Sequence, residues 1–101
     1  MTRKIRVADL PEFDLAEHLR SEEDIAAYLN AVIEEGDMAE LAHALGLVAR
    51  ARGMSEIAKA SGITREALYK ALRPNASPRF DTINRVCAAL GVRLVAQANN
   101  A

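Results

Sequence analysis

The stretch that most constrains this chain is Met54–Leu72, which reads MSEIAKASGITREALYKAL. Gly62 stands where a tight turn between two short helices would need a positive φ, a conformation that glycine adopts without steric cost. The small side chain of Ala58 allows close packing of the helices, and Ile63 is placed to plug the turn. The pattern predicts a helix-turn-helix, whose second helix enters the major groove of DNA. The alternative is a purely structural hairpin, because short helices that meet at a glycine are common.

The second helix of this motif is predicted over Thr64–Leu72, with the Thr64 hydroxyl capping its first turn. Leu68 and Leu72 are one turn apart and are expected to face inward. The first helix is predicted over about Ser55–Ala60, with Ser55 as its cap. The side chains left on the outer face of the second helix are Thr64, Arg65, Glu66, Tyr69, Lys70 and Arg73.

Arg65 is the first candidate for reading a base, because an arginine donates two hydrogen bonds to a guanine edge in one geometry. Its alternative roles are a phosphate contact and a solvated charge. Glu66 is a candidate acceptor from cytosine or a side chain that orients Arg65, and Tyr69 is either a thymine or phosphate contact or an aromatic at the edge of the core. Phosphate contacts, which fix register without carrying sequence information, are expected from Ser55, Thr64, Lys70, Arg73, Asn75 and Ser77.

Apolar periodicity and capping residues predict further helices on both sides of the motif. They run over about 14–19, 21–35, 37–52 and 79–90. Ser21 and Asp37 are expected to be N-caps, and Gly36 is expected to close the helix between them. Met38 and Phe80 are assigned to the buried stripes of their helices. The fold class is therefore mostly α, with five or six helices.

Two short strands are possible at the ends of the chain. Lys4–Val7 alternates polar and apolar residues and is a short strand or an extended arm, and Val92–Ala96 is short and β-branched. An exposed edge at Val92–Ala96 would favour a partner. Pairing with the same segment of a second chain would give a two-fold dimer, as would packing of the N-terminal helices.

Charge divides the chain into two unequal halves. Residues 1–53 hold 6 Lys/Arg and 11 Asp/Glu, a net of −5, whereas residues 54–101 hold 7 and 3, a net of +4. All eleven acids lie within 9–40, where the only basic residue is Arg20. This asymmetry indicates two faces with different partners. We divide the chain into an acidic N-terminal arm and helices, 1–36, and a DNA-binding domain, 37–101.

Several functional classes are excluded by what the sequence lacks. No apolar run approaches the ~20 residues that a membrane span requires, and no secretory signal is visible. The single cysteine, Cys87, has no internal disulfide partner, so the chain is expected to be cytoplasmic. His18 and His43 have no partners at metal-ligand spacing, and Cys87 lies on an apolar stripe. We therefore expect no enzyme activity, no metal and no cofactor.

Four segments of the chain resemble the HigA-like antitoxins of addiction modules, which carry a Cro/repressor-type helix-turn-helix. The segments are 21–29 (SEEDIAAYL), 37–53 (DMAELAHALGLVARARG), 54–72 and 77–94 (SPRFDTINRVCAALGVRL). The resemblance implies a cognate small toxin, usually a RelE-like ribonuclease, which the antitoxin binds and silences. It also implies repression of the chain's own promoter as a dimer on double-stranded DNA. The DNA contacts of the family's recognition helix would fall on Thr64, Arg65, Glu66, Tyr69 and Lys70.

The resemblance leaves the toxin-binding surface open, since no long tail follows the last predicted element. Ribonuclease toxins tend to be basic, so an acidic surface that includes Glu22, Glu23, Glu34 and Glu35 has the complementary charge. The alternative is a solubilising face. Two other functions compete with the antitoxin: a stand-alone helix-turn-helix repressor, and an interaction module that no longer binds DNA.

Overall fold

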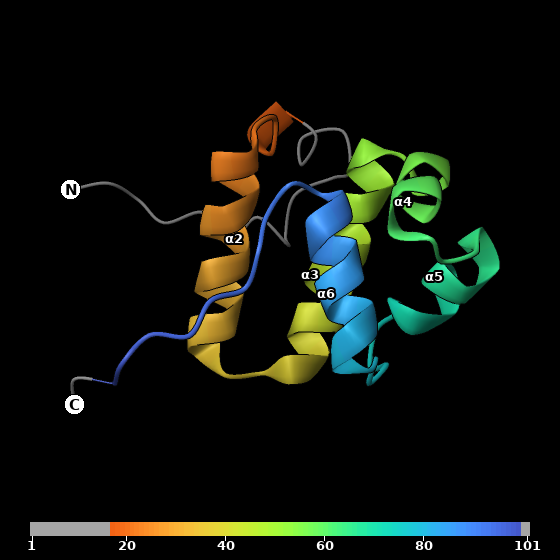
Figure 1. Ribbon diagram of the computed structural model, residues 1–101. Helices are drawn as coiled ribbons and strands as arrows, with labels where there is room; N and C mark the ends of the chain where they lie inside the picture. The colour runs from red at the N-terminus through yellow and green to blue at the C-terminus, as the bar shows by residue number, and fades with distance from the viewer. Residues whose placement is uncertain (1–16, 100–101) are drawn as a thin grey trace.

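Figure 1 shows the computed structural model of the chain, which describes residues 17–99. Within these residues the chain forms five helices and no strand. The helices are α2 (Glu22–Glu35), α3 (Met38–Arg52), α4 (Met54–Ser61), α5 (Arg65–Ala71) and α6 (Phe80–Ala89). The mostly helical fold class is thereby confirmed. The predicted strand at 4–7 and residues 14–16 of the predicted helix at 14–19 lie outside the described residues; in the rest of that helix, Glu17 and His18 are helical.

The ends of α2 and α3 follow from local hydrogen bonding, as the sequence predicted. The Ser21 hydroxyl accepts a hydrogen bond from the amide of Asp24 at 3.1 Å, and an Asp37 carboxylate oxygen accepts one from the amide of Ala39 at 3.1 Å. Between them, Gly36 has a φ of 80° and ends α2. Each cap satisfies an amide that would otherwise have no partner in the first turn.

Helix α3 lies between α2 on one side and α4 and α6 on the other (Figure 1), so it contributes most of the centre of the core. A single apolar cluster joins the helices, and α5 enters it through its inner leucines. The side chains with the largest fully buried volume are Ile25, Leu45, Leu68, Leu90, Val48, Val86 and Cys87. Burying an aliphatic side chain of this size contributes about 1.5–3 kcal/mol. Helix α5 therefore stands at the edge of the molecule but is anchored to its centre.

Gly46 is a point of close backbone approach in this core, and the sequence interpretation did not single it out. A Cβ atom at this position would lie 2.6 Å from the carbonyl oxygen of Leu72. Leu72 is the residue on which α5 ends. The missing side chain of Gly46 thus lets the end of α5 rest directly on α3.

Two residues assigned to buried stripes are exposed instead. Met38 is 58% exposed and Phe80 is 68% exposed. Each is the first residue of its helix, and α3 and α6 begin at the same end of the molecule (Figure 1). In each helix the apolar period begins one residue before the part of the helix that other helices cover. The side chain of that first residue is therefore exposed to solvent.

The prediction of a strand at Val92–Ala96 is also wrong, because the segment belongs to no β-ladder within the described residues. A ladder requires a neighbouring strand to exchange hydrogen bonds, and no such strand exists within residues 17–99. The exposure of its side chains nevertheless alternates over 92–95. Val92 and Leu94 are half-buried against the core, whereas Arg93 and Val95 are exposed.

Candidate nucleic-acid interface

Helix α4 and helix α5 are joined by a three-residue turn that begins at Gly62. Gly62 has a φ of 74°, the positive value that the sequence predicted. Its amide donates to the carbonyl oxygen of Ala58 at 3.0 Å, and the amide of Ile63 donates to the same oxygen at 3.2 Å. A side chain at position 62 would be strained in this conformation. The turn therefore depends on its glycine, and Ile63 enters the edge of the core as expected.

Ser61 is a buried polar residue of this turn that the sequence interpretation missed. Its hydroxyl donates to the carbonyl oxygen of Ala58 at 3.2 Å and accepts from the amide of Ile63 at 3.3 Å. A hydroxyl buried without such partners would cost about 1–3 kcal/mol. The serine before the predicted turn glycine was the available signal, since serine side chains commonly bond to the backbone of turns.

The start of α4 differs from the prediction. Ser55 is not the cap: the helix begins one residue earlier, at Met54, and its N-cap is Gly53, which makes no side-chain capping bond. Met54 is only 6% exposed, so its burial in the core draws this residue into the helix. Ser55 lies exposed in the first turn of α4.

Helix α5 forms much as predicted, one residue shorter at each end. The Thr64 hydroxyl oxygen accepts a hydrogen bond from the amide of Ala67 at 3.1 Å, which confirms the predicted cap. Leu68 is fully buried and Leu72 is 2% exposed, so both inward assignments are confirmed. With its inner face fixed in this way, α5 holds its other side chains on the surface.

All nine residues proposed for DNA contact are exposed. They are Ser55, Thr64, Arg65, Glu66, Tyr69, Lys70, Arg73, Asn75 and Ser77. The guanidinium carbon of Arg65 lies 5.6 Å from the centre of the Tyr69 ring, within the range of a cation–π contact. This contact aligns the arginine along the helix surface. In the described part of the chain, neither Arg65, Lys70 nor Arg73 forms an ion pair.

The loop after α5 continues this surface. The amide of Ala76 donates to the carbonyl oxygen of Arg73 at 3.1 Å, which closes a turn. Asn75 has a φ of 67°, a conformation that asparagine tolerates better than most residues. The turn holds Asn75 and Ser77 in solvent beside the end of α5.

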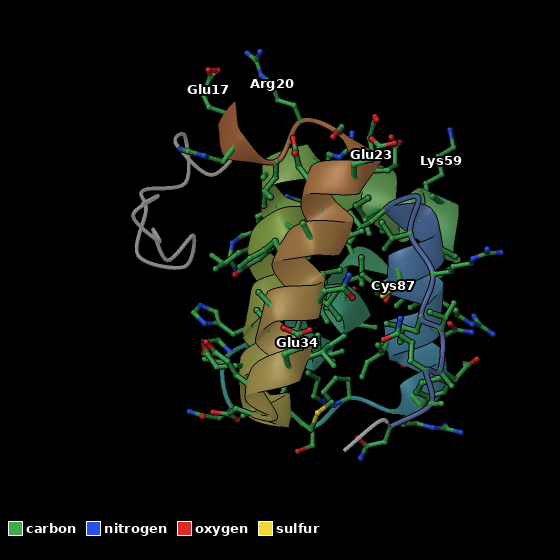
Figure 2. The ribbon with its side chains drawn as sticks, turned by 90° about the vertical axis from the view of Figure 1, so that its left-hand side faces the viewer. Glu17, Arg20, Glu23, Glu34, Lys59 and Cys87 are labelled. Atoms are coloured by element: carbon green, nitrogen blue, oxygen red, sulfur yellow. The ribbon has the colours of Figure 1, made fainter. Side chains whose placement is uncertain are left out.

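The acidic side chains of α2 lie on another part of the molecule. In Figure 2, α2 faces the viewer with Glu23 at one end and Glu34 towards the other, while Lys59 points into solvent from α4. The negative charge of Glu22 is partly compensated, because its carboxylate lies 3.7 Å from the guanidinium of Arg52. The last turn of α2 holds no basic residue. Glu34 and Glu35 therefore lie at the negative end of the helix dipole without local compensation.

The remaining reactive side chains form no catalytic cluster within the described residues. Cys87 is buried, and burial raises the pKa of its thiol, which keeps it protonated and unreactive. His43 Nδ1 lies 3.5 Å from Glu40 Oε1, whereas His18 is exposed. Within residues 17–99, no three or more His, Cys, Asp or Glu side chains are arranged so that they could hold a metal ion. No helix among the residues described is long and apolar enough to cross a bilayer.

The fold and this surface define a small helical protein that exposes Arg65, Lys70 and Arg73 along α5 and the residue that follows its end. Residues 9–98 match the family of probable addiction module antidote proteins, and the chain belongs to this family. It is also 48% identical over 88 residues to an uncharacterized protein of Haemophilus influenzae, an alignment that covers 87% of this chain and 91% of the relative. No solved structure matches the chain.

Proposed function

We propose that this chain is an antitoxin that binds and neutralises a small ribonuclease-type toxin. We further propose that it represses its own operon as a sequence-specific DNA-binding dimer of the HigA-like, Cro/repressor type. Membership of the antidote family supports the toxin partner. The DNA-binding part of the proposal rests on the exposure of the cations at helix α5. The inner leucines are buried, and the cations are exposed and form no ion pair within the described residues.

The charge and geometry of α5 suit a duplex. Arg65, Lys70 and Arg73 are exposed against one carboxylate, Glu66, so this surface has a net charge of +2 within a chain whose overall charge is −1. Cations that neutralise phosphates release counterions and make binding strongly salt-dependent. Arg65 lies in the first turn of α5, the part of a recognition helix that contacts base edges. Its contact with Tyr69 limits its rotamers before DNA binds.

DNA binding is tested by titrating labelled promoter DNA from the chain's own operon with the full chain. Arg65→Ala is expected to weaken binding to the operator by roughly 1–3 kcal/mol and to reduce the preference for operator over unrelated DNA. Lys59→Ala is the matched control, because Lys59 is an exposed cation on α4 that points away into solvent (Figure 2). Equal losses on operator and unrelated DNA would make Arg65 a phosphate contact only. The absence of any operator preference in the unmodified chain would refute sequence-specific repression.

Toxin binding is assigned to the acidic surface of α2, formed by Glu22, Glu23, Glu34 and Glu35, all of which are exposed. Opposite charge on a basic toxin accelerates association and opposes RNA binding by the same toxin surface. Carboxylates at the end of α2 cost helix stability, and a basic partner would compensate them.

The second test is co-expression with the product of the neighbouring short reading frame, followed by capture and measurement of association kinetics. Changing all four glutamates to glutamine is expected to slow association at least tenfold at low salt, with little effect at high salt. Operator binding by the same variant is the control and should be unchanged. An unchanged association rate would remove the acidic surface from the toxin interface, and failure to capture any product of the neighbouring frame would favour a stand-alone repressor.

A further inference from the structure

Arg65 and Tyr69 form a pair on the exposed face of α5. They are four residues apart in this helix, so their side chains lie on the same side of it. The guanidinium carbon of Arg65 lies over the Tyr69 ring, 5.6 Å from its centre. A cation held over an aromatic face is attracted by the charge distribution of the ring. The two side chains therefore present one combined surface to solvent.

Neither side chain of this pair is used by the fold among the residues described. Tyr69 is 42% exposed, whereas its neighbour Leu68 is fully buried and fills the core. The Arg65 guanidinium has Glu66 beside it in the sequence, yet it forms no ion pair or hydrogen bond within residues 17–99. Arginine stacked on an aromatic ring is a common arrangement for recognising nucleic acids. The pair is thus available to a ligand on the outer face of α5.

We propose that Arg65 and Tyr69 act as one reading unit, which recognises a guanine together with a thymine in the adjacent base pair of the operator. The inference deepens the proposed function and rests on it, because it requires α5 to enter the major groove. It assigns Tyr69 to base recognition, a role that the sequence left open beside a phosphate contact and the edge of the core.

The arginine accounts for the guanine. Its planar guanidinium matches the O6 and N7 acceptors of guanine, which take two hydrogen bonds in one geometry. Tyr69 restricts the rotamers of Arg65 without taking its N–H groups into a bond to oxygen or nitrogen. Ordering the arginine before DNA binds reduces the entropy that binding costs. Removing the ring should therefore weaken the preference for guanine, although the arginine itself is unchanged.

The tyrosine ring accounts for the thymine. Base pairs follow one another at about 3.4 Å along the duplex, so a ring centred 5.6 Å from a guanidinium in the plane of a guanine would lie beside the adjacent base pair. In the major groove, only the C5-methyl group of thymine is an apolar feature that distinguishes a base. The other edge groups are donors and acceptors, which an aromatic face would leave without a partner. The ring therefore favours a thymine, on either strand, next to the guanine.

The experiment measures dissociation constants of the full chain for labelled duplexes from the promoter of its own operon. A scan of single base-pair substitutions first finds the guanine whose replacement no longer matters in Arg65→Ala. Each thymine in the two adjacent base pairs is then changed to deoxyuridine, which removes only the C5-methyl group. Tyr69→Ala removes the ring, and Tyr69→Phe is the matched control because it keeps the ring and removes only the hydroxyl. The melting temperature of each variant checks its fold.

The unmodified chain and Tyr69→Phe are expected to bind the deoxyuridine duplex about fourfold more weakly, the effect of burying one methyl group, whereas Tyr69→Ala should bind both duplexes equally. Tyr69→Ala should also reduce the preference for the guanine about two- to fivefold, the range of an exposed cation–π contact. Tyr69→Phe should leave that preference unchanged.

Three results would each overturn the reading unit. Tyr69→Phe could bind as weakly as Tyr69→Ala, which would make the tyrosine hydroxyl a phosphate contact. The cost of deoxyuridine could persist in Tyr69→Ala, which would assign the methyl group to another residue. The operator could hold no thymine beside the guanine that Arg65 reads. In all three cases the unmodified chain still prefers its operator, so the proposed function stands, whereas a chain with no operator preference would remove both.

Discussion

Replacing Gly46 with alanine is expected to destabilise the fold, although alanine is the better helix former. Gly46 lies within α3, where a glycine costs about 1 kcal/mol relative to alanine. Propensity alone therefore predicts that Gly46→Ala gains about 1 kcal/mol. The new Cβ would, however, lie 2.6 Å from the carbonyl oxygen of Leu72, a backbone atom that cannot rotate away.

The steric effect should be larger than the gain in propensity. Relieving the contact requires α5 and α3 to separate, and overpacking of this kind costs about 1–3 kcal/mol. The displaced element is the C-terminal end of α5, where Leu72 is 2% exposed and fills the core. The difference between the two effects is a net loss of up to about 2 kcal/mol, equivalent to a fall of up to about 16 °C in the melting temperature for a domain of this size.

Urea denaturation followed by circular dichroism measures this difference. Ala27→Gly provides the control for propensity, because Ala27 is exposed in the interior of α2 and its substitution should cost about 1 kcal/mol without any steric effect. A Gly46→Ala variant at least as stable as the unmodified chain would refute the reasoning. It would show that the end of α5 adjusts without cost, and that α3 does not fix its position.

Two further predictions concern the cap of α5 and the alkaline limit of stability. Thr64→Ala removes the acceptor for the amide of Ala67 and should lower the free energy of unfolding by about 1 kcal/mol. Thr64→Ser keeps an acceptor and should retain most of that stability, and urea denaturation measures both differences. Raising the pH above about 8.5, the ordinary pKa of a cysteine thiol, should also lower stability, because burial raises the pKa of the Cys87 thiol, and burial together with Glu40 raises the pKa of the Tyr28 phenol. The unfolded chain releases these protons first, so stability falls as pH rises. Tyr28→Phe should flatten that decline in a pH series of melts, and an equally steep decline would argue against the phenol's contribution.

The elements that sequence predicted correctly are those fixed by local chemistry. Ser21, Asp37 and Thr64 cap helices because each hydroxyl or carboxylate reaches an amide two or three residues away. Gly36 and Gly62 end helices because each has a positive φ. In these cases the interacting groups are close in sequence, so the pattern contains the whole interaction.

The errors arise where the outcome depends on distant parts of the chain. Met38 and Phe80 match the period of their helices, but nothing covers their side chains at the helix ends. Gly46 has no local signal, because the atom that requires its missing side chain belongs to Leu72. For Val92–Ala96, the short β-branched stretch predicted a strand. It could not supply the neighbouring strand that a ladder needs.

The positions of α2 and α5 indicate that the proposed toxin and the proposed DNA operator can bind the chain at the same time. Helix α5 and helix α2 lie on opposite sides of the molecule (Figure 1), and α3 fills the space between them. A toxin held by the carboxylates of α2 would therefore leave Arg65 and Tyr69 open to a duplex. Because the two helices are separated by more than a Debye length of about 10 Å, the charges of α2 and of a bound toxin are largely screened from DNA phosphates at α5. On this reasoning the neutralised complex should bind the operator about as tightly as the antitoxin alone, and a much weaker complex would show that the toxin covers α5.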